Sequence, residues 1–206
     1  MLQRKRVPFV TMTIATFTIV IHALSSTVTL QYDRAAIAAG DTWRLFTGHF
    51  THWNTNHLFW DLLMFVVLGI LIEMESKRTL AWLILGSASA ISMFTWLLSP
   101  ELATYRGLSG IDTTLFVFVA CRYLFAAIGN RQWHQCIVPA VLLGSALVKF
   151  SFDALTGSRL FVDSQSAGFT VFLEAHLVGV AIGIIAAIVL VLCQRHPRVE
   201  PSVCAS

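Results

Sequence analysis

Charged residues are scarce in this sequence. Only 12% of its 206 residues are Asp, Glu, Lys or Arg, whereas a soluble domain carries about 25%. No basic stretch is interleaved with aromatic residues, so nucleic acid is not an expected partner. The four cysteines lack CxxC spacing, which argues against both a disulfide framework and a zinc ribbon.

Hydrophobic residues are abundant instead. They make up 56% of the chain, and the mean hydropathy is +0.73. They fall into runs long enough to cross a bilayer, which takes about 20 apolar residues per helix. We therefore expect an all-α polytopic membrane protein in which residues 1–206 form a single domain embedded in the lipid bilayer.

Six apolar runs are expected as transmembrane helices, at about 8–30, 57–72, 79–98, 109–128, 136–152 and 174–193. The core of the domain should cover about 43–193, between short cytoplasmic tails at 1–7 and 194–206. A short interfacial helix is expected within residues 41–50, because Trp43, Trp53 and Trp60 are placed as an interfacial aromatic belt would place them.

The lysines and arginines predict the orientation. With six spans, nine of them fall on the side of the termini: Arg4, Lys5, Arg6, Lys77, Arg78, Arg122, Arg131, Arg195 and Arg198. The opposite side holds four: Arg34, Arg44, Arg106 and Arg159. The positive-inside rule then puts both termini in the cytoplasm, as in a multi-pass protein of a bacterial inner membrane.

Three reactive side chains begin the runs that travel inward. His57, Ser109 and His176 open the second, fourth and sixth runs, so alternation of the spans brings them to one depth near the external face. Two glycines, Gly179 and Gly183, form a GxxxG step that lets helix backbones approach closely. Gly110 follows Ser109 directly, and a close contact between runs four and six would bring His176 to Ser109.

This pattern predicts nucleophilic catalysis. A serine hydroxyl becomes a nucleophile when a neutral imidazole within hydrogen-bond reach takes its proton. Gly107 allows a tight turn before Ser109, and free N–H groups at a helix N-terminus can stabilise an oxyanion. The alternative interpretation is that Ser109 is a helix cap and His176 an interfacial histidine.

These motifs resemble the rhomboid family of intramembrane serine proteases. The matching segments are Gly107-Leu108-Ser109-Gly110, Ala175-His176-Leu177-Val178-Gly179 with Gly183, His52-Trp53-Asn54-Thr55-Asn56-His57 and Trp43-Arg44-Leu45-Phe46-Thr47. The order of the six helices also fits. The string from Tyr105 to Gly110 and the compact length are similar to the rhombosortase branch, which processes C-terminal membrane anchors of surface proteins.

The resemblance implies a Ser109–His176 dyad without a third acid and without a cofactor or metal. It also implies an oxyanion hole formed by His57 and the Ser109 N–H, with Gly107 and Leu108 positioning the substrate. The substrate would be a transmembrane segment of a membrane protein, cleaved near its external end. A catalytically silent relative that binds such segments is the alternative, and a transporter or channel is a third class.

Asp61 departs from the family pattern, which has an oxyanion-donating asparagine at this position. Three arrangements are open: a protonated Asp61 that donates, an Asp61 that pairs with His57 or another base, or a weakened protease. The carboxyl should face the bundle interior because a charge facing lipid is costly. Asp112, three residues after Ser109, could orient a base or meet loop water, and the second is expected.

A metal site is a further alternative. His49, His52 and His57 bring three ligand-type side chains into a short stretch. The sequence contains no HExxH motif, so a zincin-type site is unsupported.

Overall fold

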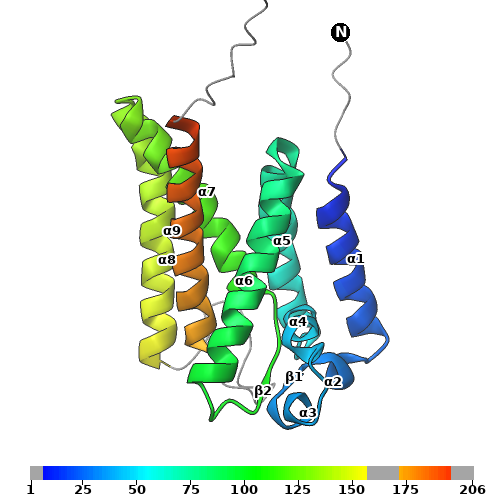
Figure 1. Ribbon diagram of the computed structural model, residues 1–206. Coiled ribbons are helices and arrows are strands. Elements are labelled where there is room, and N and C mark those ends of the chain that lie inside the picture. Colours follow the sequence, from blue (N-terminus) through cyan, green and yellow to red (C-terminus); the bar gives the residue numbers. More distant parts are fainter. Residues whose placement is uncertain (1–6, 157–171, 196–206) are drawn as a thin grey trace, which may run out of the picture.

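The computed structural model describes residues 7–156 and 172–195, and helices dominate it (Figure 1). Five helices among these residues are long and apolar enough to cross a membrane. They are α5 (Thr55–Glu75), α6 (Lys77–Leu98), α7 (Ser109–Gly129), α8 (Ile137–Thr156) and α9 (Leu173–Arg195). The 3-10 turn η2 (Trp133–Cys136) directly precedes α8. With the shorter apolar α1 (Phe9–Ala23), they confirm the expected all-α polytopic fold. The predicted tails lie almost wholly outside the described residues.

The first apolar run is not a single helix from residue 8 to 30, and that expectation is wrong. α1 ends at Ala23, Ser25 takes a left-handed φ of 54°, and a separate turn, α2 (Thr27–Leu30), follows. At ~1.5 Å per residue α1 is about 22 Å long, short of the ~30 Å hydrocarbon core. Glu73 of α5 accepts hydrogen bonds from the N–H groups of Val10 and Thr11, both 2.8 Å, so α5 caps the start of α1.

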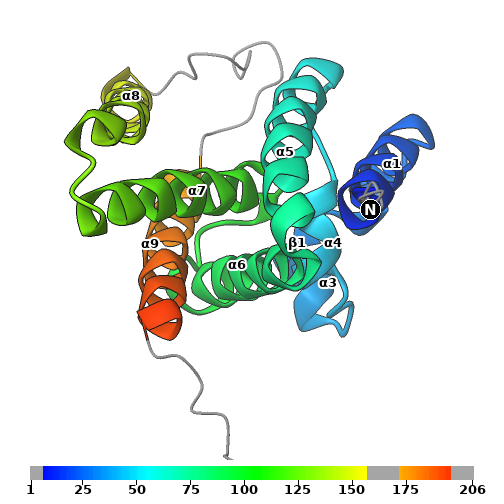
Figure 2. The ribbon, with the colours of Figure 1, turned by 90° about the horizontal axis from the view of Figure 1, so that it is seen from above.

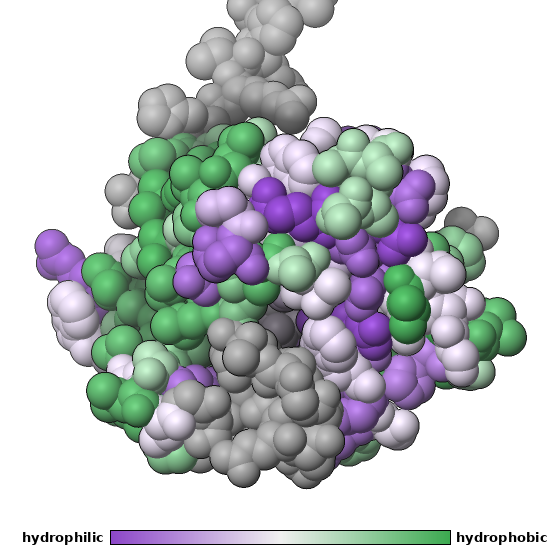
Figure 3. Space-filling model, turned by 90° about the horizontal axis from the view of Figure 1, so that it is seen from below, coloured by the Kyte–Doolittle hydropathy of each residue, from purple (hydrophilic) through white to green (hydrophobic). Residues whose placement is uncertain are grey.

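Short elements gather at one end of the bundle, which we call the loop-rich end (Figure 1). Besides α2 it contains β1 (Tyr32–Asp33), α3 (Arg34–Ala38), α4 (Arg44–Thr47), the 3-10 turn η1 (Gly48–Phe50) and β2 (Thr104–Tyr105). The short helix expected within residues 41–50 is therefore present as α4 and η1. In Figure 3, which looks onto this end, hydrophilic residues form a band with hydrophobic surface beside it.

Two contacts fasten the loop-rich end to the bundle. β1 pairs antiparallel with β2, with Tyr32 opposite Tyr105, so the segment after α1 is tied to the segment before α7. Arg34 donates hydrogen bonds to the carbonyl groups of Thr95 and Ser99, at 2.6 and 2.9 Å, where α6 ends. A guanidinium there satisfies carbonyl groups that the helix itself leaves open.

The central helix is α7. It packs against α5, α6 and α9, and the buried core between them contains Phe65, Leu115 and Phe118. Figure 2 shows α1 and α8 on opposite sides of this group. Most of α8 is exposed and apolar, with Val141, Leu147 and other large side chains uncovered, as expected for a helix that faces lipid.

Candidate active site

α5, α7 and α9 all begin at the loop-rich end (Figure 1). Ser109 is the first residue of α7, His57 lies in the first turn of α5, and His176 in the first turn of α9. The N-cap position of α7 belongs to Leu108, and no side chain caps that helix. The alternative that Ser109 serves as the helix cap therefore does not match the structure.

Small residues bring α7 and α9 together beside Ser109 and His176. A Cβ atom built on Gly110 would lie 3.2 Å from the carbonyl oxygen of Ala175, so the neighbours of Ser109 and His176 are in contact. A Cβ on Gly179 would collide with the carbonyl oxygen of Gly110, and one on Gly183 would lie 2.8 Å from that of Thr114. The GxxxG step thus faces α7 along its length.

Ser109 and His176 line one cavity. It has a volume of about 740 Å³ and is bounded by α5, α7, α8 and the start of α9. His176 is 5% exposed, and the ring of Phe150 from α8 lies 5.4 Å from its imidazole ring. Most other lining side chains are apolar, including Leu63, Met64 and Phe116. A cavity of this kind suits an apolar polypeptide segment with few polar contacts.

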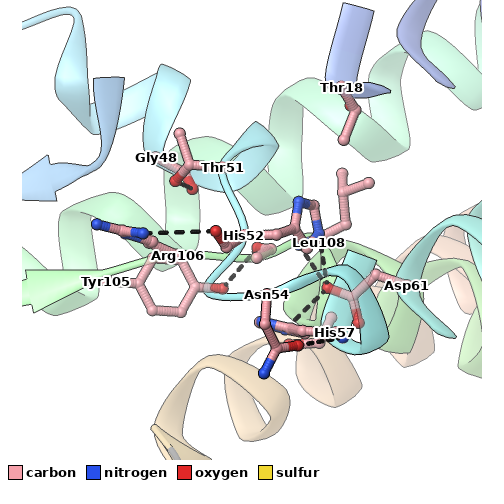
Figure 4. Close-up of polar contacts among 12 residues, drawn as sticks. Thr18, Gly48, Thr51, His52, Asn54, His57, Asp61, Tyr105, Arg106 and Leu108 are labelled. Atoms are coloured by element: carbon pink, nitrogen blue, oxygen red, sulfur yellow. Dashed lines mark hydrogen bonds and ion pairs between the residues drawn. The ribbon is translucent and has the colours of Figure 1, made fainter. Parts of the chain in front are cut away.

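Asp61 is the centre of a buried polar cluster (Figure 4). Its Oδ2 accepts a hydrogen bond from the Leu108 N–H at 3.0 Å. The Nε2 atoms of His52 and His57 lie 3.1 and 3.2 Å from the same oxygen. Asp61 is 5% exposed, so its carboxyl lies in the bundle interior and its contacts match the pairing arrangement.

Local structure explains how the histidines reach Asp61. Asn54 caps α5 by accepting a hydrogen bond from the His57 N–H at 2.8 Å, which fixes the first turn of the helix. His57 and Asp61 are four residues apart and share one face. His52 comes from the loop before α5. Burial lowers its pKa below 6.5 while Asp61 acts in the opposite direction, so at pH 7 a neutral ring donates from Nε2.

The turn before Ser109 is held from several sides. Gly107 has a φ of +123°, and a Cβ there would lie 2.9 Å from the His57 ring, so both conformation and space require glycine. Tyr105 donates its hydroxyl to the Gly107 carbonyl at 3.1 Å. Arg106 donates to the Gln31 side chain at 2.7 Å and lies over the ring of Trp53. Leu108 is fully buried.

His49 does not join the other two histidines. Its Nε2 lies 3.0 Å from the hydroxyl oxygen of Ser92 and 3.2 Å from the Ala88 carbonyl, both on α6. The group with metal-ligand spacing is instead His52, His57 and Asp61, whose ligand atoms lie within 4.8 Å of one another. The predicted trio of histidines is therefore wrong as a cluster.

Asp112 is a buried residue of the same region. It is 6% exposed, in the first turn of α7, and lines the same cavity as Ser109 and His176. Sequence reasoning named His52 but did not pair it with Asp61, and it missed Phe150, because these side chains come from a loop and from α8. The only local signal for His52 was its short spacing before His57.

A family model for the rhomboid domain matches residues 39–193. No curated protein matches the sequence. The matched region contains all the elements that line the cavity, from α5 to most of α9, together with the turn before Ser109. The chain is therefore an integral, multi-pass membrane protein that belongs to the rhomboid family.

Proposed function

We propose that this protein is an intramembrane serine endopeptidase that cleaves transmembrane segments of membrane-anchored proteins. The observation that carries the proposal is that Ser109 and His176 line one cavity at the loop-rich end, on helices in close contact. The charge distribution of the loops favours an external loop-rich end and cytoplasmic termini in a bacterial inner membrane. The likeness to the rhombosortase branch favours membrane-anchored surface proteins as substrates.

In the proposed reaction, Ser109 Oγ attacks the scissile carbonyl carbon while His176 takes the hydroxyl proton. The proton then passes to the leaving amine as the C–N bond breaks, and water hydrolyses the acyl-enzyme through the same base. Oxyanion charge would develop at the start of α7, where the Ser109 N–H is a donor. Apolar walls of the cavity exclude bulk water from this step.

Asp61 is proposed to act through the turn and not by touching the substrate. Its carboxylate accepts the Leu108 N–H, one residue before Ser109, and so fixes the direction of the backbone that carries the oxyanion donor. His57 lies with Nε2 toward the same carboxylate, so it braces this turn from α5. We infer that both are positioning residues for the oxyanion side of the site.

The nucleophile assignment is tested with a fluorophosphonate or isocoumarin probe. The wild type should be labelled covalently, and Ser109→Ala should lose the label because the variant lacks the hydroxyl that is proposed to react with the probe. Ser145→Ala is the matched control: this serine lines the same cavity, but its hydroxyl donates to the Leu142 carbonyl at 2.8 Å. Equal labelling of wild type and Ser109→Ala would refute the assignment.

A silent binder of transmembrane segments is the competing function, and the carboxylate at position 61 is the feature that favours it. Co-expression with a reporter membrane protein separates the two. A protease yields a fragment that depends on Ser109 and His176. A silent binder retains the intact reporter and yields no such fragment.

A further inference from the structure

We propose that Asp112 is a specificity residue of the cavity: its carboxyl group accepts a hydrogen bond from a donor side chain of the bound segment. The protein would thus prefer membrane segments that carry an N–H or O–H donor just inside the scissile bond. This inference rests on the proposed protease function, because it places the substrate at Ser109.

Asp112 is buried, and its carboxyl group is unsatisfied in hydrogen bonding. Its residue exposure is 6%, and both carboxylate oxygens lack a hydrogen-bond partner among the described residues. A buried polar group without a partner costs about 1–3 kcal/mol, and a charged one costs more. Because the Asp112 carboxyl group lines a cavity, a bound ligand can supply the missing hydrogen bond and remove this cost.

Several other polar groups of the cavity are already engaged. Lys149 is the cation of the lining, and it donates to Asp153 at 2.6 Å on its own helix. Thr113 donates its hydroxyl to the Ser109 carbonyl at 2.8 Å. Asp61 holds the Leu108 N–H and the two imidazoles. These contacts leave Asp112 as the carboxylate of the cavity that a substrate group can engage.

The position of Asp112 predicts where the donor belongs. Asp112 and Ser109 are three residues apart on α7 and face the same side, which puts Asp112 about 4.5 Å deeper along the helix. An extended segment rises ~3.3 Å per residue, so the donor would come one or two residues beyond the scissile bond, toward the bundle interior. The wall of the cavity also contains the apolar side chains of Leu63, Met64 and Phe116, which offer a donor no acceptor.

The test uses three reporter segments that differ only at this position: Lys, Ser and Leu. For each enzyme variant we compare kcat/KM of the donor reporters with kcat/KM of the Leu reporter, since this ratio cancels differences in expression. The wild type should prefer the Ser reporter over the Leu reporter by about 2- to 10-fold, as one hydrogen bond between neutral groups implies. It should prefer the Lys reporter by about 10-fold or more, because the lysine can form a charge-assisted pair with the Asp112 carboxyl group. Asp112→Leu should bring both ratios to about 1.

Asp112→Asn is the second variant, since it keeps the shape and an acceptor oxygen but cannot release a proton to form an ion pair. It should lower the kcat/KM ratio of the Lys reporter to the Leu reporter by about 10-fold and retain most of the corresponding ratio for the Ser reporter. If neither variant changes the kcat/KM ratios, the proposed role of Asp112 is refuted. If Asp112→Leu does not fold, the test rests on Asp112→Asn alone: an unchanged ratio of the Lys reporter to the Leu reporter refutes the proposal.

If the protein is not a protease, no reporter gives a Ser109-dependent fragment, so this failure is distinguishable from failure of the subsite. Binding without cleavage is then measured by photo-crosslinking. The Lys and Leu segments are each crosslinked to Ser109→Ala and to Ser109→Ala/Asp112→Asn. A preference for Lys that disappears with Asp112→Asn supports the subsite. Equal capture of the two segments by Ser109→Ala refutes it.

Discussion

Asp61→Asn tests the oxyanion side of the proposed site. One carboxylate oxygen holds the Leu108 N–H at 3.0 Å and lies 3.1 and 3.2 Å from two imidazole nitrogens. Asparagine keeps an acceptor oxygen but loses the charge. Its NH2 group would also face the Leu108 N–H and the imidazole N–H groups, which are themselves donors. The variant therefore weakens all three contacts while the volume stays almost the same.

The expected magnitude follows from the contacts. A hydrogen bond to a charged group contributes about 1.5–3 kcal/mol and a neutral one about 0.5–1.5. The difference is about 1 kcal/mol per contact, or about 2–3 kcal/mol for three contacts that are partly coupled. If that free energy positions the turn before Ser109, kcat/KM should fall by about 30- to 100-fold.

Two measurements decide the outcome: Ser109-dependent cleavage of a reporter and thermal unfolding in detergent. Asp41→Asn is the matched control, because Asp41 pairs with Arg44 at a partly exposed site and such pairs contribute about 0–1 kcal/mol. Asp61→Asn should reduce both cleavage and stability, and Asp41→Asn should leave them near wild type. An Asp61→Asn variant as active as the wild type, or more active, would refute the positioning role.

Two further expectations concern packing and pH. Gly179→Ala should destabilise the protein by about 1–3 kcal/mol or more, because the added methyl group collides with the Gly110 carbonyl. Gly144→Ala on α8 is the control and should leave stability unchanged, because no described atom lies within 4 Å of the added methyl group. Equal melting temperatures of the two variants would contradict the α7–α9 contact. Burial lowers the pKa of His49 from 6.5 to about 4, so the unfolded chain binds the proton first as pH falls below 6.5. Lowering the pH from 7 to 5 should then cost about 2 kcal/mol of unfolding free energy, and His49→Gln should remove that part of the slope; identical slopes in the two proteins would speak against it.

The sequence by itself determined the helices and their direction. Apolar runs need about 20 residues to cross a bilayer, so α5, α6, α7, α8 and α9 were predicted within a few residues of their observed bounds. Alternating direction brought the starts of α5, α7 and α9 to the same end of the bundle (Figure 1), and these starts carry His57, Ser109 and His176. These are properties of local composition and connectivity, which a sequence displays directly.

Tertiary structure decided which side chains meet. Asp61 could have donated, paired or repelled; its pairing with His52 and the Leu108 N–H depends on the path of two loops that no periodicity encodes. The end of α1 at Ala23 was hidden inside a continuous apolar run, because hydropathy does not detect a turn at Ser25. The sequence did not show that the Asp112 carboxyl group lines the cavity without a hydrogen-bond partner among the described residues, since the rotation of α7 and the position of α8 are set by packing rather than by sequence spacing.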